Sequence, residues 1–519
     1  MANVKATDLI DFTRASKGHA LAKVSYGEEL VENGTFDSDL SGWTVVSGSA
    51  TVTNGEAVVS YDGANGGLSQ YITVEVGKLY EIKASLTATT SSGPRLKIGT
   101  TNNGNDIKNI TIVADVFEKF VATTTTISIF AQAIGDGSTT IDNISVKEVL
   151  FNQPDGTLQL FEHPNNIPRI EYDADGNLLG LLIEEARTNG LPYSEDFTEW
   201  TQNQSSVVEN DAIAPDKTTT ADAIVKTNAV NVFWSRRETF IFSTNTTYTL
   251  SVFAKAIDAN YLMLRQVGEA NGRTWFDLST GTVGTQQSDI ESASIEEYDN
   301  DWFRCSITFT TGSSISNNLV DISFFQADGS TLSAEGVSGY VWGAQLEQGS
   351  FPTSYIKTTG STVTRSADVA SIDVDQFGYN QSEGTVVVHA QAFGRDAGAY
   401  PRVVELNDGT ASNRIMFFPL DSLQLQVQVS GSTQAALDGG AIVYNQFSKY
   451  AGGIKAGDFN LSLDGSPVVS DTSGSMPAVT ELRVGADHTG SSNFLNGHIK
   501  SITYTPKRLS NAKLQELTS

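Results

Sequence analysis

Apolar and polar residues alternate along most of the chain, in short runs separated by clusters of Gly, Asn, Asp and Ser. Clear examples are residues 80–88, 247–255 and 384–391. A period of two places successive side chains on opposite faces of a β-strand, and turn residues at this spacing are typical of sandwiches and jelly rolls. Because 519 residues exceed what one core usually holds, we predict an all-β, multidomain chain of jelly rolls and β-sandwiches.

The helical period is found in one place, near the C-terminus. Ser510 is expected to be the N-cap of a short helix that presents Leu514 and Leu517 on one face. Upstream of this helix, the pair Asp464-Gly465 is a strong hairpin signal. No heptad stretch is found, so any oligomer is expected to form through sheets or loops rather than through a coiled coil.

Two stretches of the chain form a weak internal repeat. In each, an Asx-rich segment leads to a Trp, a turn leads to a strand that begins with Tyr, and an alternating strand closes the unit. The segments of the first copy and then of the second are 33–43, 76–85 and 141–148, and 193–200, 244–254 and 341–347. We predict two copies of one sandwich, followed by a different third region from about residue 379.

Tryptophan in such a chain has two common roles. An exposed Trp can stack on the apolar face of a sugar, but a Trp in an alternating strand is more often part of the core. Trp43 and Trp200 hold equivalent positions in the repeat, which favours a shared packing role. The six Trp are Trp43, Trp200, Trp234, Trp275, Trp302 and Trp342.

Acidic residues strongly outnumber basic ones. The chain has 60 Asp and Glu against 33 Lys and Arg, which gives a formal net charge of -27. Phosphate-rich partners need a basic surface, so we expect no nucleic-acid partner. The chain lacks an apolar run of about 18 residues, and its N-terminus lacks the apolar core of a secretory signal. We therefore expect synthesis in a cytoplasm and no membrane insertion.

Cysteine and histidine offer little material for metal or redox chemistry. The single cysteine, Cys305, lies in an alternating strand pattern, so it is expected to be buried and cannot form an intramolecular disulfide. The five His include His389 and His498, which each stand alone on a strand pattern. No zinc motif is found, and no cofactor is expected to be required.

Residues 173–184 imitate a calcium-binding loop. The residues that match positions 1, 3, 5 and 12 of such a loop are Asp173, Asp175, Asn177 and Glu184. However, the turning position holds Leu178 instead of Gly. Residues 172–178 can equally form a hairpin, which we favour. Arg187 is expected to pair with Glu184 or Glu185.

Five segments taken together resemble virion proteins of tailed phages, of the tail-fibre and head-spike-fibre kind. The segments are DFTRASK (11–17), GLLIEEARTN (180–189), YSEDF (193–197), WGAQLE (342–347) and FPTSYIKTTGS (351–361). This resemblance covers residues 1–27 and 151–370. Residues 28–150 resemble a carbohydrate-binding-module jelly roll, and residues 375–519 resemble a laminin-G or concanavalin-type sandwich.

The resemblances imply a division of the chain into five parts. These are an N-terminal segment for attachment or oligomerisation (1–27), a carbohydrate-binding-module-like jelly roll (28–150), a connector hairpin segment (151–190), a second jelly roll (191–370) and a C-terminal sandwich (375–519). The apolar run 178–183 is too short for a domain core and is expected to need a cover. We therefore expect a homo-oligomer, specifically a trimer, that forms through residues 1–27 and 151–190.

The function implied by the resemblances is adsorption to a host. They imply a fibre or spike on the phage particle surface, assembled in the host cytoplasm, with host cell-surface polysaccharide and other virion proteins as partners. Repeated weak sugar contacts would give avidity. Two polar loops of the third region suit ligand contact, and their candidate carbohydrate-binding residues are Arg395, Tyr400, Asp487, His488 and Asn493.

The carbohydrate-module resemblance also implies a structural calcium ion. Such jelly rolls often hold calcium between the first and last strands through Asx or Glu oxygens, and Asp37 and Asp142 occupy roughly those places. The competing interpretation is that Asp37 and Asn33 cap turns.

Two further functions stay open. One is a purely architectural role as a capsid or tail decoration protein. The other is a capsule depolymerase, because concanavalin-type sandwiches also include hydrolases. Glycoside hydrolysis needs two carboxylates that face each other across the scissile bond. The third region has no tight acidic cluster on one strand, so we expect no enzyme activity and assign no catalytic residue.

Overall fold

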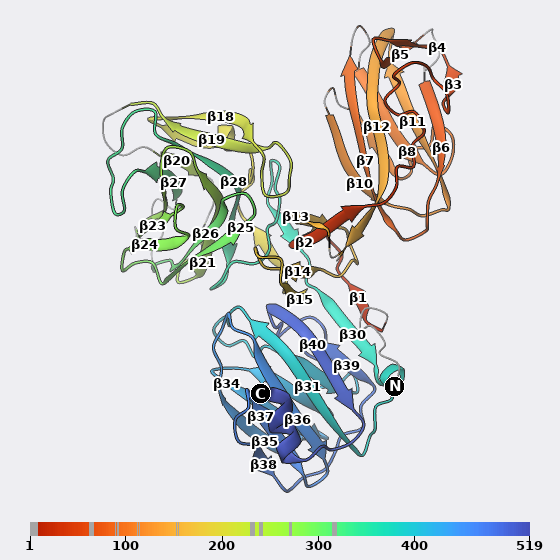
Figure 1. The fold of residues 1–519 in the computed structure, drawn as a ribbon. Coiled ribbons are helices and arrows are strands. Elements are labelled where there is room, and N and C mark those ends of the chain that lie inside the picture. The colour runs from red at the N-terminus through yellow and green to blue at the C-terminus, as the bar shows by residue number, and fades with distance from the viewer. Residues whose placement is uncertain are drawn as a thin grey trace. The chain divides into compact units, whose positions relative to one another are not determined.

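The computed structural model describes residues 9–61, 67–88, 90, 93–111, 113, 115–151, 153, 155–228, 234–237, 242–268, 272–313 and 319–519. In this part of the chain, antiparallel strands are combined with a single α-helix (Figure 1). The predicted all-β, multidomain fold is confirmed. The chain divides into two compact units, one formed by residues 23–157 and the other by residues 1–22 and 158–519.

The unit of residues 23–157 is a jelly roll. Its strands are β3 (Thr44–Ser47), β4 (Ser49–Thr53), β5 (Glu56–Tyr61), β6 (Gly67–Thr73), β7 (Leu79–Ala88), β8 (Gly93–Gly99), β9 (Lys108–Ile110), β10 (Asp115–Val121), β11 (Thr126–Ile134) and β12 (Gly137–Phe151). One sheet has the order β10-β7-β12-β5-β4, and the other has the order β3-β6-β11-β8-β9. Alternate residues such as Ile82, Leu96 and Ile129 fill the core between them. The end of β12 also pairs with the last residues of β2 (Gly18–Tyr26).

A second jelly roll lies in the larger unit. Its strands are β17 (Thr201–Asn203), β18 (Ser205–Ala212), β19 (Ala221–Lys226), β20 (Trp234–Arg237), β21 (Thr247–Ala256), β22 (Tyr261–Val267), β23 (Arg273–Asp277), β24 (Thr282–Gln286), β25 (Ser292–Tyr298), β26 (Trp302–Thr310), β27 (Leu319–Phe325) and β28 (Ser338–Gln348). The two sheets have the orders β18-β19-β28-β21-β26-β25 and β17-β20-β27-β22-β23-β24. Buried Cys305 belongs to the core between them, as expected.

The two jelly rolls share one topology. Strands β3 to β9 correspond in order to β17 to β23, and β10 to β12 correspond to β26 to β28. The second copy adds β24 and β25. Both closing strands carry a bulge at the same place, with a left-handed residue in each: Asn143 has φ 53° and Gly343 has φ 62°. The predicted internal repeat is therefore confirmed.

The repeated Trp residues serve packing, as predicted. The indole of Trp43 donates to the Glu32 carbonyl oxygen at 3.0 Å, and that of Trp200 donates to the Tyr193 carbonyl oxygen at 3.0 Å. Each indole lies against a Phe of the preceding loop, at centroid distances of 5.4 Å and 5.0 Å. Three further Trp are buried, namely Trp275, Trp302 and Trp342. The side chain of Trp234 lies outside the described part of the structure.

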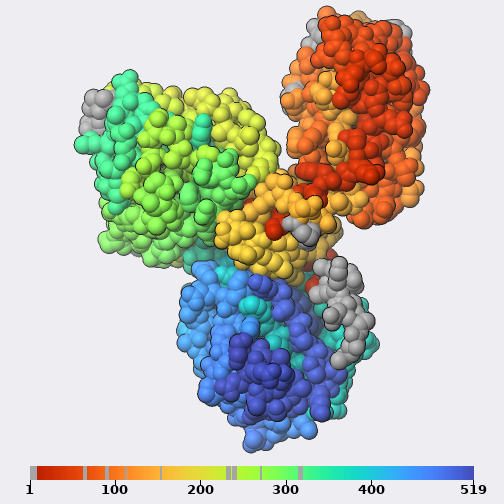
Figure 2. All heavy atoms as spheres, viewed as in Figure 1, coloured from red at the N-terminus to blue at the C-terminus, as the bar shows by residue number. Residues whose placement is uncertain are grey.

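The C-terminal sandwich consists of two seven-stranded sheets and the helix α1 (Asn511–Thr518), part of which is visible at the surface in Figure 2. Its strands are β1 (Asp11–Thr13), β14 (Ile170–Tyr172), β15 (Leu178–Ile183), β30 (Val369–Asp373), β31 (Glu383–Ala392), β32 (Val404–Asn407), β33 (Arg414–Pro419), β34 (Ser422–Val429), β35 (Ser432–Ala441), β36 (Ser448–Lys455), β37 (Phe459–Leu463), β38 (Val469–Asp471), β39 (Glu481–Val484) and β40 (Gly497–Thr505). The sheet orders are β1-β30-β39-β32-β33-β34-β35 and β14-β15-β40-β31-β36-β37-β38.

This sandwich takes strands from sequence far upstream of residue 375. Strand β1 pairs with β30, and the β14–β15 hairpin pairs with β40. The physical reason is apolar burial, because Phe12, Leu181 and Ile183 are part of the sandwich core. The apolar run 178–183 therefore finds its cover within the same chain. The oligomer was expected because this run needed a cover from another chain, and that argument no longer applies.

The local signals near the C-terminus are confirmed. The Ser510 hydroxyl accepts a hydrogen bond from the Lys513 amide at 3.3 Å, which makes Ser510 the N-cap. Leu514 is buried in the sandwich, whereas Leu517 is half-buried. Asp464 and Gly465 both have positive φ, at 44° and 73°, at the turn between β37 and β38.

A buried network of charges joins distant segments within the larger unit. Asp368 contacts the guanidinium groups of Arg14, at 3.1 Å, and of Arg169. Glu184 contacts Arg169 at 2.8 Å and Arg365 at 3.4 Å. The side chains of all five residues are at most 1% exposed. The network lies where β1, the β14–β15 hairpin and a small sheet of β16 (Arg187–Asn189) and β29 (Val363–Arg365) meet.

The predicted hairpin at residues 173–177 is confirmed, and a calcium loop is not formed there. Asp173 accepts a hydrogen bond from the Asn177 amide at 2.7 Å and closes the turn between β14 and β15. Glu184 cannot complete a loop because it lies in the buried charge network. Arg187 pairs with Glu185 at 2.5 Å and with Asp396 at 2.8 Å, so Glu185 is the correct one of its two predicted partners.

Candidate ligand-binding site

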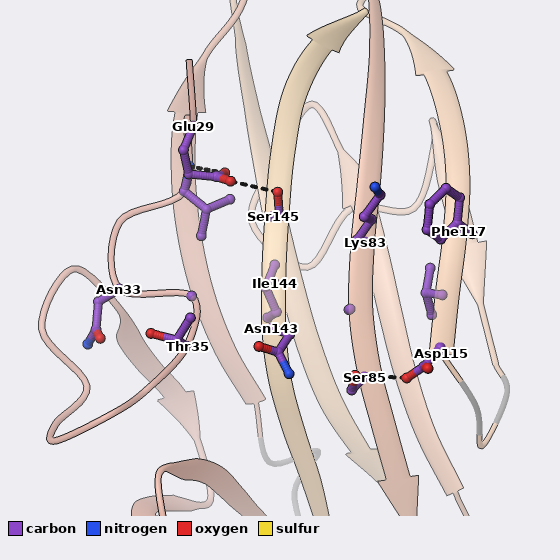
Figure 3. Close-up of a pocket in the computed structure, with 14 residues that line it drawn as sticks. Glu29, Asn33, Thr35, Lys83, Ser85, Asp115, Phe117, Asn143, Ile144 and Ser145 are labelled. Atoms are coloured by element: carbon purple, nitrogen blue, oxygen red, sulfur yellow. Dashed lines mark hydrogen bonds between the residues drawn. The ribbon is translucent and has the colours of Figure 1, made fainter. Parts of the chain in front are cut away.

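A hollow of about 560 Å³ lies on the β10-β7-β12 sheet of the first jelly roll. Figure 3 shows its walls, which come from neighbouring strands and from the segment that precedes β3. The lining residues are Glu29, Val31, Asn33, Gly34, Thr35, Lys83, Ala84, Ser85, Asp115, Val116, Phe117, Asn143, Ile144 and Ser145. Strand register sets two cross-strand pairs on this face, Lys83 with Phe117 and Ser85 with Asp115. We call this hollow the jelly-roll site.

An exposed aromatic ring and a positioned cation stand at one side of the jelly-roll site. Phe117 is 51% exposed, and the Lys83 ammonium lies 4.3 Å from its ring centroid. The Lys83 ammonium also contacts the Glu81 carboxylate at 3.0 Å, and the Tyr26 hydroxyl donates to that carboxylate at 3.0 Å. Because Glu81 is buried, these contacts hold Lys83 beside the ring.

Hydroxyl, carboxylate and amide groups form the rest of the jelly-roll site. The Ser85 hydroxyl donates to Asp115 at 2.8 Å, and the Ser145 hydroxyl donates to Glu29 at 2.6 Å. Asn143 occupies the bulge of β12, which turns it toward the hollow (Figure 3). An exposed ring beside fixed polar groups suits a sugar, which has an apolar face and hydroxyls at its edge.

A close backbone approach fixes the wall formed by residues 29–35. The Ile144 amide donates to the Gly34 carbonyl oxygen at 2.9 Å. A Cβ at Gly34 would lie 1.9 Å from the Ile144 carbonyl oxygen. Only glycine therefore allows this segment to lie against the bulge of β12.

The same face is covered in the second jelly roll. Tyr80 pairs with Phe120 in the first copy as Tyr248 pairs with Phe309 in the second. Counting from these pairs, Arg304 holds the position that Asp115 holds in the jelly-roll site. The Arg304 guanidinium donates to the Thr353 carbonyl oxygen at 2.7 Å, so residues 351–355 lie over this face. The hollow on the first copy is open by comparison.

Sequence reasoning missed the jelly-roll site, although β10 contains a signal for it. Val116 and Phe120 are buried in the core, which places Asp115 and Phe117 on the opposite, polar face. When an aromatic residue occupies a strand position that the alternation assigns to the polar face, its ring is expected to be exposed. The sequence does not give the register of the strands. Without it, one cannot see that β7, the bulge of β12 and residues 29–35 meet on the same face as Phe117.

The two polar loops of the C-terminal sandwich do lie together. The Tyr400 amide donates to the Asn493 side chain at 3.1 Å, and Tyr400 is 53% exposed. Asp487 is 4% exposed and holds its own loop, because Ser492 and Asn493 donate to its carboxylate at 2.5 Å and 2.9 Å. Burial alone would raise the pKa of Asp487, but these hydrogen bonds lower it.

The other two predicted residues of these loops have protein partners. Arg395 pairs with Asp421 at 3.3 Å, and the His488 amide donates to Glu405 at 3.0 Å. The structure therefore brings Tyr400, Asp487 and Asn493 to one place. Their role in sugar binding stays a prediction.

The candidate calcium residues Asp37 and Asp142 are close enough for their charges to interact. Asp37 accepts a hydrogen bond from Thr35 at 3.0 Å, as a turn residue does. One oxygen of Asp142 is buried without a partner, and the other accepts from Asn143 at 2.8 Å. Burial raises the pKa of Asp142, and the charges of Glu56 and Asp37 raise it further. Within the described ranges, no group of three or more His, Cys, Asp or Glu is placed to hold a metal ion.

Replacing Asp142 by Asn is expected to raise the melting temperature in the presence of a chelator, because the amide removes a partly buried charge that Glu56 and Asp37 repel. Differential scanning fluorimetry of the full chain would measure this. Millimolar calcium is expected to stabilise the unchanged chain and not the variant if Asp142 binds the implied ion. If Asp142→Asn melts at a lower temperature than the unchanged chain in the presence of chelator, charge repulsion from Glu56 and Asp37 does not destabilise Asp142.

None of the helices in the described part of the chain is long and apolar enough to cross a membrane.

No protein-family model and no curated protein matches the chain. Among solved structures, it is similar to the CBM40 of the Ruminococcus gnavus IT-sialidase bound to alpha2,3 sialyllactose, with 13% identity, 28% of this chain and 86% of that chain covered, and a TM-score of 0.25. The CBM22-1-CBM22-2 tandem domain of Paenibacillus barcinonensis Xyn10C gives 12% identity, 64% and 99% coverage, and a TM-score of 0.21. Trypanosoma rangeli sialidase gives 10% identity, 96% and 94% coverage, and a TM-score of 0.24. At these identities and TM-scores, the similarities establish neither a family nor a ligand for this chain.

Proposed function

We propose that this chain is a fibre or spike protein of a tailed phage particle and that it binds host cell-surface polysaccharide. The motif resemblance of residues 1–27 and 151–370 supports the virion role. The observation that supports glycan binding best is the jelly-roll site, where exposed Phe117 stands beside Lys83 and a row of polar groups.

Binding would combine stacking with hydrogen bonds. The apolar face of a sugar ring would lie on Phe117, and its hydroxyls would contact Ser85, Asp115 and Asn143. A single shallow site of this kind binds weakly, so adsorption would depend on many copies per particle. A homotrimer anchored to other virion proteins would supply such copies. Binding to an anionic polymer is expected to strengthen with moderate salt, because salt screens the net charge of -27.

Replacing Phe117 by Ala is expected to weaken binding of host polysaccharide fragments by about tenfold, because aromatic contacts contribute roughly 0.5–1.5 kcal/mol beyond area burial. Isothermal titration calorimetry of the full chain would measure the affinity. Tyr400→Ala is the matched control, since Tyr400 is an exposed aromatic residue of the loops predicted from sequence. We expect this control to bind as the unchanged chain does.

Other outcomes separate the competing functions. If Tyr400→Ala weakens binding and Phe117→Ala does not, the glycan site lies in the C-terminal sandwich. If the unchanged chain binds no host polysaccharide, the architectural role is supported instead. Incubation with the polymer should release no new reducing ends. Sustained release would show a depolymerase and contradict the proposal.

A further inference from the structure

A second cavity, of about 550 Å³, lies within the larger unit, over the face of the second jelly roll that corresponds to the jelly-roll site. Strand β25, which the first copy lacks, forms one wall. Its residues Ser294, Glu296 and Tyr298 alternate onto one face, and Glu296 stands opposite Arg304 in the sheet. The β14–β15 hairpin, residues 351–355 and His498 of β40 complete the enclosure. We call this the enclosed cavity.

A buried His–Glu pair lines the enclosed cavity. The His498 Nε2 donates to Glu171 at 2.7 Å, and the Leu21 amide donates to the other Glu171 oxygen at 3.1 Å. His498 is 4% exposed, and its Nδ1 is buried with no hydrogen-bond partner.

Glu296 is a second carboxyl group in the wall, opposite Arg304 in the sheet. It makes no ion pair in the part of the chain that the structure describes, although solvent reaches it within the cavity. Surrounding protein raises its pKa by desolvation, and nearby Glu171 raises it further, against the lowering effects of Arg304 and His498. Arg304 is the one Lys or Arg among the lining residues, and its guanidinium already donates to Ser251 and Thr353.

The remaining lining groups do not supply positive charge. Burial lowers the pKa of His19 to about 4, so His19 is neutral at ordinary pH. Glu297 and Asp175 add two more carboxylates to the wall. An acidic sugar would be repelled by this surface, whereas a cation would be attracted. A volume of this size holds one or two sugar rings.

We propose that the enclosed cavity binds the protonated amine of an amino sugar, with Glu296 and Glu171 as its carboxylate partners and Tyr298 in the wall. This inference rests on the proposed glycan-binding function and names a second, chemically different site for it. A metal ion is not the preferred cation, because the described residues form no group placed to hold one. The neighbouring aromatic side chains suit the ring of a sugar.

Binding in the enclosed cavity depends on pH in a defined direction. The titratable and charged groups that face Glu296 are Glu171, His498, Arg304 and Tyr298, with Glu297 next to it in sequence. An amine pairs only with ionised Glu296. At pH values below the pKa of the ligand amine, where the free amine already carries its proton, binding to a chain with protonated Glu296 releases a proton, and affinity falls as the pH falls further.

The test uses the full chain and a tetramer of glucosamine, measured by isothermal titration calorimetry in two buffers that differ in ionisation enthalpy. Glu296→Gln keeps the shape of the side chain and removes its charge. It is expected to weaken binding by about threefold to fivefold, because Glu296 is exposed and an ion pair that solvent reaches contributes only modestly. Glu291→Gln, at an exposed acid just before β25, is the matched control. Melting temperatures would show that both variants are folded.

The outcomes distinguish this inference from the proposed function. Loss of binding in Glu296→Gln but not in Glu291→Gln or Phe117→Ala, together with proton release, supports it. No binding of the tetramer, or binding that only Phe117→Ala weakens, overturns it and leaves the jelly-roll site standing. Equal binding of the N-acetylated tetramer overturns the role of the amine. Binding of spermidine without the sugar overturns the amino sugar as the ligand.

Discussion

Replacing Asp368 by Asn is expected to lower the free energy of unfolding by about 3–5 kcal/mol, the range found when one partner of a buried ion pair is removed. Asp368 is fully buried between Arg14, Arg169 and Arg365. Without its charge, Glu184 alone would balance three guanidinium groups. Burial and the charge of Arg169 already lower the pKa of Arg14 to about 10 with Asp368 present.

Urea denaturation of the full chain, followed by tryptophan fluorescence, would measure this loss. Lys17→Ala is the control, because the Lys17–Glu162 pair has a similar geometry at 2.7 Å but side chains that are 57% and 29% exposed. Exposed pairs contribute about 0–1 kcal/mol, so the control should be nearly neutral. Equal losses in the two variants would contradict the idea that burial makes the Asp368 network important.

Lowering the pH from about 6.5 to about 4 is expected to destabilise the larger unit by roughly 3 kcal/mol through His19 alone. Desolvation lowers the pKa of His19 from 6.5 to about 4 and lowers that of His163 well below 6.5. Both rings are buried and donate through Nδ1, His19 to the Tyr355 carbonyl oxygen at 2.8 Å and His163 to that of Phe161 at 3.2 Å.

The sign follows from proton uptake. Between the folded and unfolded pKa values, the unfolded chain binds a proton at each His and the folded chain does not, so stability falls as the pH falls. Glu184 acts in a lower window. Burial would raise the pKa of Glu184, but Arg365 and Arg169 hold it well below 4.5, so its contribution is lost only as the pH falls below that value.

Unfolding free energies measured at a series of pH values would test this. The double variant His19→Asn with His163→Asn keeps a side-chain N–H donor at each place and removes the titration. In this variant, the free energy of unfolding is expected to change less between pH 6.5 and 4 than in the unchanged chain, whatever the stability of the variant at neutral pH. His389→Asn, at a partly exposed strand position, should keep most of the slope. If the free energy of unfolding of the double variant depends on pH as that of the unchanged chain does, groups other than these two histidines cause the acid sensitivity.

Such buried networks could not be predicted, because their members are far apart in sequence. Arg14 and Asp368 are separated by 354 positions, and no local pattern marks them as partners. The same applies to Glu184, which imitates a calcium ligand in sequence and is a buried ion-pair partner in the structure. A residue type at a suitable spacing suggests a role, but burial and neighbours decide which role it has.

What the sequence determined by itself is local in origin. Alternation of apolar residues set the strands, the Trp43 and Trp200 segments revealed the repeat, Ser510 marked the helix start and Asp464-Gly465 marked a turn, because each of these signals acts within a few residues. Only the tertiary structure decided which strands share a sheet. Pairing placed Phe12 and Leu181 in the C-terminal core, gathered Lys83, Phe117 and Asn143 around one hollow, and brought Glu296 to the wall of a second cavity. These outcomes depend on burying apolar surface between segments that lie tens to hundreds of residues apart, which no local pattern specifies.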